Sequence, residues 1–414
     1  MPYILALNCG SSSLKYQVFD ADTRQSVVGG TVERIGSPDS FVTQKYPDGA
    51  KQRKGTEMKD HNEALNVAIY MLRDASIDLT QIVGVGHRVV MGGDKFKSSL
   101  EATDEVMRTI EELAIIAPLH NPANLMGIVA AKQLLPNAKQ VAVFDTAFFS
   151  TLPDYAYRYA VPSAWYKELG VRKYGFHGTS HLYVSKRAAE MLGRPARDVN
   201  LVTLHIGNGA SAAAIRGGVA VDTSLGMTPL SGLTMGTRPG DLDPGILIYV
   251  MQRLGLTPEQ MQVHLNKQSG LLGLTECFAD RRDVEKNLAT NDLCRLAMDI
   301  ESNNVKRYIG GYMAELGHTD AIVFTAGVGE NDSVLREKML TGLEELGVKI
   351  DREKNDRAVG RLGSEEAEIS TPDSKVKIFM IPTNEELVIV EDTIAVIDGT
   401  YKPDHLEMNY SFAK

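Results

Sequence analysis

The chain has 414 residues, of which 43% are hydrophobic and 23% charged, and its formal net charge at pH 7 is −9. A chain of this length exceeds one ordinary core, so we expect two to three domains. The acidic balance argues against nucleic acids and anionic membranes as partners. The three cysteines have no metal-type spacing, no apolar run reaches membrane-spanning length, and the start lacks a signal-peptide pattern. Together these features predict a cytoplasmic protein with reduced thiols.

The first part of the chain predicts strands that then alternate with helices. Short apolar or β-branched runs predict strands near residues 3–8, 14–20, 27–34, 82–90 and 140–148. Apolar residues at helical spacing predict helices over 60–75 and 104–116. Asn121 followed by Pro122 is typical of an N-cap and first turn, and it predicts a helix that continues to about residue 134.

The second part of the chain repeats this order. The predicted strands cover residues 201–207, 320–327 and 375–382. The predicted helices cover residues 181–192, 243–254, 258–267, 291–316, 330–346 and 384–397. Because strands come first in each part and α/β alternation follows, we expect two α/β lobes with mixed sheets.

One pattern occurs twice, in residues 4–19 and 201–217: an apolar strand, a turn rich in Gly, Ser and Asn, and a second apolar strand. Turns with so little side-chain bulk let backbone N–H groups and hydroxyls approach an anion. The polar residues in and after the first turn are Asn8, Ser11, Ser13 and Lys15. By themselves they fit an ordinary polar β-turn equally well. The second copy favours phosphate binding, and it predicts two related lobes that hold one phosphate chain between them.

Two acidic residues are candidate metal ligands. Asp145 ends an apolar strand, and Glu385 follows another. Such carboxylates either cap helices or bind Mg²⁺, which needs only one or two carboxylates plus water when it bridges phosphates. The pair suffices for Mg²⁺ if the fold brings the two side chains together. No P-loop and no dinucleotide fingerprint occur in the sequence.

Two arginines and three histidines are candidates for anion chemistry. Arg88 ends a buried strand, and Arg238 lies in a loop of glycines and prolines. Arginine suits bidentate recognition of carboxylate or phosphate, although a structural salt bridge remains open for each. His120, His177 and His205 lie near Gly-rich or Pro-rich turns, and each also fits a structural role. His177 is the strongest catalytic candidate of the three. No arrangement resembles a zinc site, such as His residues four apart with a Glu between them, and no G-x-S-x-G elbow occurs.

Nine segments, in family order over nearly the whole chain, resemble those of acetate kinases. They are NCGSSSLKY (8–16), GHRVV (86–90), APLHNP (117–122), VFDTAF (143–148), YGFHGTSH (174–181), HIGNGAS (205–211), GLTMGTRPGDLDP (232–244), FTAGVGEN (324–331) and IPTNEEL (381–387). Acetate kinases belong to the acetate and sugar kinase, Hsp70 and actin superfamily. The resemblance implies an α/β fold of two duplicated actin-like (ribonuclease H-like) lobes with mixed sheets and an active-site cleft between the lobes.

The resemblance also implies how the chain is divided. It assigns residues 1–149 and the C-terminal segment 385–414 to the N-terminal lobe. Residues 150–384 form the C-terminal lobe, which binds the nucleotide and makes the contact of a homodimer.

The implied reaction is ATP + acetate ⇌ ADP + acetyl phosphate, with Mg²⁺ as cofactor and Mn²⁺ as an alternative. Transfer is direct and in line, and it asks mainly for positioning and charge neutralisation. By resemblance, Arg88 and Arg238 clamp the acetate carboxylate and the moving phosphoryl group. His177 and Arg238 stabilise the transition state, and Asp145 also orients the carboxylate nucleophile. Acetate is already ionised at pH 7, so no general base is needed.

The resemblance assigns the remaining site residues to the metal and the nucleotide. The metal would be placed by Asn8, Asp145 and Glu385. Residues matched to the nucleotide and its phosphates are Asn8, Ser11, Ser13, Lys15, His205, Asn208, Gly209, Asp280, Arg282, Gly327, Glu330 and Asn331. His120 falls on a family position near the phosphates.

Four apolar residues match those that surround the acetate methyl group in the family: Val90, Leu119, Phe176 and Pro229. Valine at position 90 favours acetate, but one methylene is worth only ~1–3 kcal/mol, so some activity on propionate is expected. The chain departs from the family at Met91, where His is usual, and at Pro239, where Ser is common. Two alternatives stay open: a propionate or butyrate kinase of the same family, and a non-catalytic nucleotide-binding regulator on the same scaffold.

Overall fold

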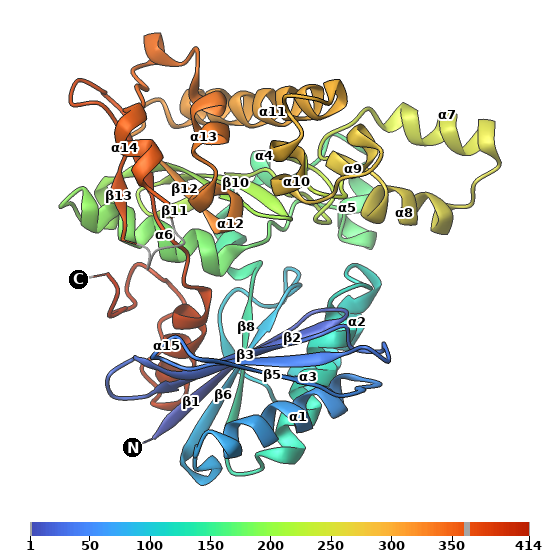
Figure 1. Ribbon diagram of the computed structural model, residues 1–414, viewed down its shortest axis with the longest axis vertical. Coiled ribbons are helices and arrows are strands. Elements are labelled where there is room, and N and C mark those ends of the chain that lie inside the picture. The colour runs from blue at the N-terminus through green and yellow to red at the C-terminus, as the bar shows by residue number, and fades with distance from the viewer. Residues whose placement is uncertain (1, 360–364, 414) are drawn as a thin grey trace. The chain divides into compact units, whose positions relative to one another are not determined.

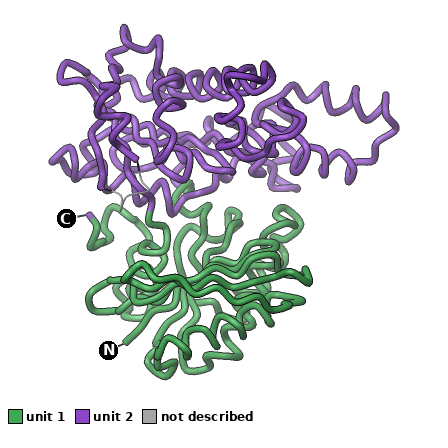
Figure 2. Tube along the Cα trace, viewed as in Figure 1, with its two compact units in different colours: residues 1–150, 384–412, 414 green, residues 151–383, 413 purple. Residues whose placement is uncertain are grey.

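The computed structural model describes residues 2–359 and 365–413. The chain divides into two compact units, shown in Figures 1 and 2. Unit 1 contains the chain up to Ser150 together with Asn384–Phe412, and unit 2 contains Thr151–Thr383. The chain therefore enters unit 2 once and returns to unit 1 just before its last helix. Met1 and Lys414, the two ends of the predicted N-terminal lobe, lie outside the described residues.

Unit 1 is built on an eight-stranded sheet in the order β5-β4-β3-β2-β1-β6-β8-β7. The strands are β1 (Tyr3–Cys9), β2 (Ser13–Asp20), β3 (Ser26–Glu33), β4 (Phe41–Lys45), β5 (Lys51–Gly55), β6 (Ile82–Val89), β7 (Leu100–Glu101) and β8 (Lys139–Phe144). β1 is antiparallel to β2, and β2 to β3. β1, β6 and β8 are parallel neighbours, so their carboxyl ends meet at one edge of the sheet.

Unit 2 is built on a six-stranded sheet in the order β11-β10-β9-β12-β14-β13. The strands are β9 (Asn200–Ile206), β10 (Ala210–Arg216), β11 (Val219–Thr223), β12 (Ala321–Thr325), β13 (Ala367–Glu368) and β14 (Lys377–Met380). β9 is antiparallel to β10 and β10 to β11, whereas β9, β12 and β14 are parallel. Six strands of each sheet thus share one order and one set of directions, because β7 is antiparallel to β8 as β13 is to β14. This is the structural counterpart of the doubled sequence pattern.

Helices cover both faces of the unit 1 sheet because its central strands are apolar on both sides. Leu5 and Leu7 of β1 belong to the core beneath α1 (His61–Asp74) and α3 (Asn121–Leu134). Ile4 and Ala6, which alternate with them, belong to the core beneath α15 (Glu385–Ile397). The continuous apolar run at the start of the sequence is therefore a strand buried on two faces. Unit 1 also contains α2 (Asp104–Glu112).

Unit 2 contains most of the remaining helices. They are α4 (Asp154–Tyr157), α5 (Ser163–Leu169), α6 (Gly178–Met191), α7 (Pro244–Leu254), α8 (Pro258–Lys267), α9 (Gly270–Thr275), α10 (Arg281–Lys286), α11 (Asp292–Leu316), α12 (Ala326–Asn331), α13 (Ser333–Leu340) and α14 (Arg352–Arg357). Helix α6 packs on β9 and β12, and α11 packs on β10 and β9. Among the described helices, none combines the length and apolarity needed to span a bilayer.

Most predicted elements are confirmed, and some details are wrong. The strand predicted over 140–148 ends at Phe144 as β8, and Ala147–Thr151 forms a 3₁₀-helix. Asn121 is the first residue of α3 and not its N-cap, which is His120. The predicted helix over 330–346 is broken, because the side chain of Asp332 accepts a hydrogen bond from the N–H of Leu335 and starts α13 there. β4 and β5 were not predicted, since their residues are largely polar and every residue of β5 is exposed.

Candidate active site

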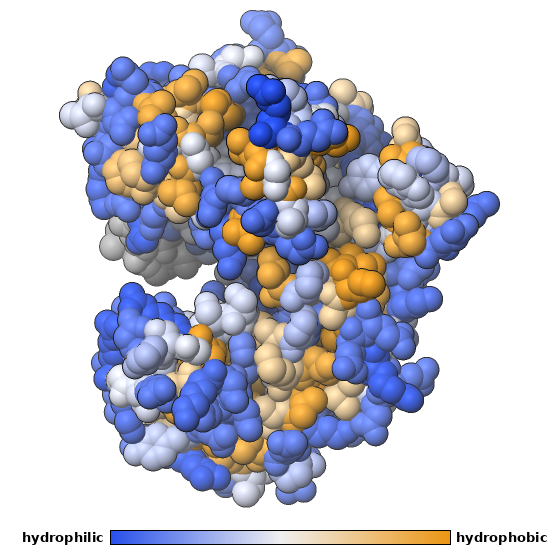
Figure 3. All heavy atoms as spheres, turned by 90° about the vertical axis from the view of Figure 1, so that its right-hand side faces the viewer, coloured by the Kyte–Doolittle hydropathy of each residue, from blue (hydrophilic) through white to orange (hydrophobic). Residues whose placement is uncertain are grey.

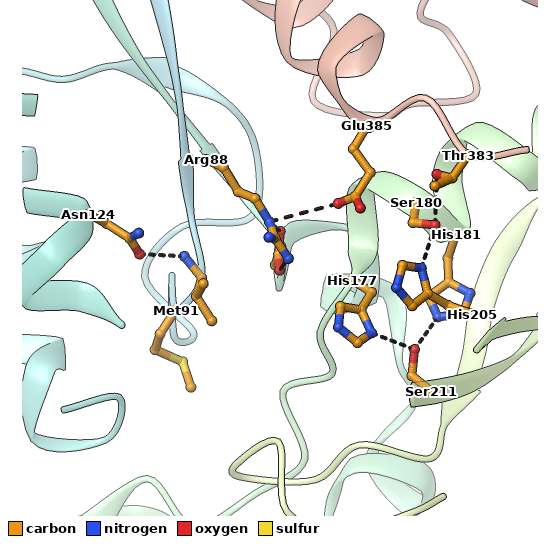
Figure 4. Close-up of polar contacts among 12 residues, drawn as sticks. Arg88, Met91, Asn124, His177, Ser180, His181, His205, Ser211, Thr383 and Glu385 are labelled. Carbon is orange, nitrogen blue, oxygen red and sulfur yellow. Dashed lines mark hydrogen bonds and ion pairs between the residues drawn. The ribbon is translucent and has the colours of Figure 1, made fainter. Parts of the chain in front are cut away.

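Three charged residues of unit 1 meet at the carboxyl edge of its sheet. Arg88 is at the end of β6, Asp145 follows β8, and Glu385 begins α15. The guanidinium of Arg88 donates two hydrogen bonds to the carboxylate of Asp145, Nε to Oδ1 at 2.8 Å and Nη2 to Oδ2 at 2.7 Å. Its Nε also lies 3.8 Å from Oε2 of Glu385, as Figure 4 shows. The two predicted metal-binding carboxylates are therefore brought to the same arginine.

Arg88 is firmly charged in this setting. Its side chain is 17% exposed, and that of Asp145 is 1% exposed. Burial lowers the pKa of Arg88, but the carboxylates of Asp145 and Glu385 outweigh burial and raise it above its ordinary value. Asn384 caps α15 by accepting a hydrogen bond from the N–H of Leu387, so the helix does not need Glu385 as its cap.

The donor set of unit 1 suits Mg²⁺. Among the residues that the structure describes, no cluster of three or more His, Cys, Asp or Glu side chains is arranged to hold a metal ion by itself. Mg²⁺ usually takes one or two carboxylates and completes its shell with water and phosphate oxygens. Asp145, Glu385 and the amide of Asn8 supply oxygen donors of that kind. The residues present therefore fit an ion that the protein shares with phosphates.

The backbone that follows Arg88 is fixed by two buried asparagines of α3. Asn124 accepts a hydrogen bond from the N–H of Val90 at 3.0 Å and donates to the carbonyl of Cys9 at 2.7 Å. Asn121 accepts from the N–H of Met91 and donates to its carbonyl, both at 3.1 Å. These bonds use only the backbone of residue 91, so the change from His to Met leaves the loop in place.

The first Gly/Ser turn is closed by its own backbone. The N–H of Gly10 donates to the carbonyl of Ser13 at 2.8 Å, and a ring nitrogen of His61 lies 2.6 Å from the carbonyl oxygen of Gly10. Ser11 and Lys15 are exposed. Asn8 and Lys15 line a pocket of about 580 Å³. The role of both side chains in binding phosphate stays a prediction.

The second turn brings an arginine and a histidine together. The N–H of Gly236 donates to the carbonyl of Asn208 at 3.1 Å, which ties the arginine loop to the turn. A Cβ atom added to Gly209 would lie 2.7 Å from Nη2 of Arg238 and 3.6 Å from Nε2 of His177. Only glycine leaves room for this position of the Arg238 guanidinium, whereas 3.6 Å is an ordinary contact distance for His177. His177 has a φ of 58°, in the left-handed region that residues other than glycine seldom adopt.

Arg238 has no acidic partner among the residues described. Its Nη1 donates to the carbonyl oxygen of Pro229 at 2.7 Å, and its side chain is half-buried. Burial lowers the pKa of Arg238. A partly desolvated cation with a single carbonyl partner would be stabilised by a bound anion. The hydrogen bonds that fix its loop come from Met235, Gly236 and Thr237, so Pro239 does not disturb them.

Five of the predicted nucleotide residues line one pocket of unit 2: Asn208, Asp280, Arg282, Gly327 and Asn331. Its volume is about 560 Å³, within the range of small-molecule sites. Glu330 is not in the lining; its carboxylate accepts a hydrogen bond from the N–H of Thr383 at 3.1 Å. His205 stacks on His177, with ring centroids 4.1 Å apart.

The predicted acetate residues divide between the units. Val90 and Leu119 lie in unit 1, whereas Phe176 and Pro229 lie in unit 2. Leu119 is 42% exposed and Phe176 is 2% exposed. Contact of these four residues with the acetate methyl group stays a prediction.

Three buried charges in the wall of the unit 2 pocket were missed from the sequence. Nε of Arg281 lies 3.0 Å from Glu301, and its Nη2 lies 3.5 Å from Asp332. Burial raises the pKa of Glu301 to about 7. Several polar atoms of the three side chains have no hydrogen-bond partner. Since they come from separate helices and resemble ordinary surface charges in the sequence, no spacing could reveal them.

Comparison with known proteins agrees with this geometry. The family model described as the Acetokinase family matches residues 3–391. The acetate kinase of Trichlorobacter lovleyi is 50% identical, over 99% of this chain and 98% of its own. The chain belongs to the acetokinase family.

Solved structures of this family are closely similar. Porphyromonas gingivalis acetate kinase has a TM-score of 0.90 and 44% identity, covering 96% of this chain and 100% of that one. A propionate kinase from Francisella tularensis has a TM-score of 0.89 and 40% identity, covering 95% and 99%. These matches confirm the predicted resemblance and the α/β fold of two duplicated lobes with mixed sheets.

We expect Gly209→Ala to lower the kcat of this acetokinase-family protein by roughly 100-fold, because the new methyl group displaces the guanidinium of Arg238 and a shift of about 1 Å has that cost. The thermal midpoint should change little, since the clashing Nη2 atom is the end of a flexible side chain. Gly311→Ala is the control, because Gly311 in α11 is exposed and its added Cβ meets nothing within 4 Å. Equal kcat in the two variants would contradict the assigned role of Gly209.

Proposed function

We propose that the protein is a Mg²⁺-dependent acetate kinase that reversibly transfers the γ-phosphate of ATP to acetate, giving acetyl phosphate and ADP. One observation carries the proposal: the guanidinium of Arg238 lies without a carboxylate partner, among the described residues, beside a glycine turn and His177. That combination matches a site for a transferring phosphoryl group. The name of the relative at 50% identity supports the same reaction.

The pocket of unit 2 would hold the nucleotide. Its volume of about 560 Å³ suits a nucleoside phosphate. Asn208 and the backbone of Gly209 would bind the β- and γ-phosphates. Gly327 and Asn331 of α12, together with Asp280 and Arg282 across the pocket, would contact the nucleoside.

Arg238 and His177 would stabilise the phosphoryl group during its transfer. Charge on its equatorial oxygens can be stabilised by the guanidinium and by a ring N–H of His177. In-line transfer needs no covalent enzyme intermediate, so preorganised donors supply most of the catalysis.

The residues of unit 1 would handle the acceptor and the metal. Arg88 is held in one orientation by Asp145 and Glu385 and would bind the acetate carboxylate. Mg²⁺ would be held by Asp145, Glu385 and Asn8 with water, and it would neutralise phosphate charge. Acetate arrives ionised, so no side chain has to remove a proton. Val90, fixed by Asn124, would limit the acyl chain, which favours acetate while permitting slower transfer to propionate.

Arg238→Ala should lower kcat by about 10³-fold, because a transition-state arginine supplies stabilisation of that order. Arg295→Ala is the control, since Arg295 is exposed and its guanidinium contacts only Asp292 of the same helix and the carbonyl oxygen of Leu288, neither of which lines the pocket. A coupled assay of ADP formation measures both. Turnover of Arg238→Ala within a few-fold of the parent protein would rule out this role.

We also infer that the protein is a homodimer and that α7 of unit 2 forms part of the contact. No residue of α7 is buried, although its sequence is PGILIYVMQRL. Its exposed apolar side chains include Ile248 at 60%, Tyr249 at 62% and Leu254 at 68%. Figure 3 looks at the side on which α7 lies in Figure 1, and apolar residues, in orange, gather on that face of unit 2. Exposure of such an apolar surface to water is unfavourable, and contact with a second copy of the chain would bury it.

Ile248→Asp should therefore convert the protein from a dimer to a monomer in sedimentation velocity, because a charge would be buried in the contact. Ile115→Asp is the matched control, since Ile115 is 87% exposed on unit 1. A parent protein that sediments as a monomer, or an Ile248→Asp variant that remains dimeric, would contradict the inference.

A further inference from the structure

Ser211 joins two histidines in the interior of unit 2. Its Oγ lies 2.9 Å from Nδ1 of His177 and 2.8 Å from Nε2 of His181. Nδ1 of His181 in turn lies 2.7 Å from Oγ1 of Thr203. Figure 4 shows Ser211 between the two imidazoles. Ser211, His181 and Thr203 all have 0% exposure. Bulk water therefore does not compete for the hydrogen bonds that connect His177, Ser211, His181 and Thr203.

Regular structure puts these four side chains together. His177 and His181 are four residues apart at the start of α6, and therefore lie on one face of the helix. Thr203 and His205 are two residues apart in β9, and Ser211 of β10 is directly opposite His205. Since α6 packs on β9, the helix face meets the sheet face.

In this series of hydrogen bonds each group must donate to the next one in the same direction. Burial lowers the pKa of His181 well below its ordinary value, so the ring is neutral and has one donor and one acceptor nitrogen. The hydroxyl of Ser211 has a single proton. It donates either to His177 while it accepts from His181, or to His181 while it accepts from His177.

The chemistry of a phosphoryl group selects between the two directions. Phosphoryl oxygens are acceptors, and Nε2 is the nitrogen of His177 that faces Gly209 and Arg238. A neutral His177 can donate from Nε2 only when its Nδ1 is the acceptor. Nδ1 then has to receive the proton of Ser211.

We propose that Ser211 is a positioning residue that donates its hydroxyl hydrogen bond to Nδ1 of His177 and thereby keeps Nε2 of His177 as the donor to the phosphoryl group. The order of donors is Thr203, His181, Ser211 and His177. No proton leaves any residue, and the arrangement sets a tautomer and an orientation before substrate arrives. The proposal rests on the function proposed above for His177.

The first test needs no variant of Ser211. In ¹⁵N-histidine spectra of the full-length protein, the signal of His177 is identified by its absence from His177→Gln. We expect the chemical shift of an unprotonated Nδ1 and a protonated Nε2. A protonated Nδ1 at neutral pH would overturn the proposal.

The second test is kinetic. Ser211→Ala should lower kcat by about 10- to 100-fold, the range of one lost preorganised interaction, and leave KM for ATP and acetate within about two-fold. Its His177 signal should move toward a mixture of tautomers. Thr203→Val, which removes the first donor at similar volume, should change kcat in the same direction by less. Ser185→Ala is the control, because Ser185 is a buried serine of α6 whose hydroxyl bonds only Leu182 of its own helix.

Failure of this inference differs from failure of the proposed function. If His177→Gln loses activity while Ser211→Ala matches Ser185→Ala in kcat, the role of Ser211 is wrong and that of His177 stands. If His177→Gln keeps normal kcat, the assigned role of His177 is itself wrong, and the inference falls with it.

Discussion

The guanidinium of Arg238 is half-buried, bonded to one carbonyl, and separated from Gly209 by just enough space for a hydrogen in place of a methyl group. Leaving a cation in this state costs free energy unless an anion arrives. Arg88 is the opposite case, because the carboxylate of Asp145 holds it by two hydrogen bonds. Arg88 is thus paired with carboxylates and oriented by them, whereas Arg238 has no carboxylate partner among the described residues. The division suits a reaction in which charge moves from one group to another.

The two sheets repeat one strand order, but the repeat does not give two equal phosphate sites. In unit 1 the carboxyl edge of the sheet has the candidate metal ligands Asp145 and Glu385 and the paired Arg88. In unit 2 the corresponding turn, at Gly207–Ser211, is flanked by His177, Arg238 and the pocket proposed for the nucleotide. In the proposed function the duplicated strands provide the positions, and the residues inserted around them specify carboxylate phosphorylation.

Much of this could be predicted from the sequence, for physical reasons. β1 and β9 are apolar on both faces, so their runs are unmistakable, and the polar residues at strand ends had to meet because parallel strands end together. β5 was missed because it is an edge strand of polar, exposed residues, and β4 was missed because its short sequence is largely polar although part of it is buried. The sequence did not predict the cluster of Arg281, Glu301 and Asp332, because these residues are far apart in the sequence. The hydrogen bonds through Ser211 had a signal in the sequence, because His177 and His181 are four residues apart and Thr203 and His205 are two residues apart. The spacing alone does not show which strand the helix covers.

The most direct test of the account is ADP formation by the purified protein with ATP and Mg²⁺, measured with acetate, with propionate, with butyrate and without added acid. The account predicts that ADP forms only when a carboxylic acid is present, fastest with acetate, and that hydroxylamine traps acetyl phosphate in equal amount. ADP formation at the same rate without acid would contradict it.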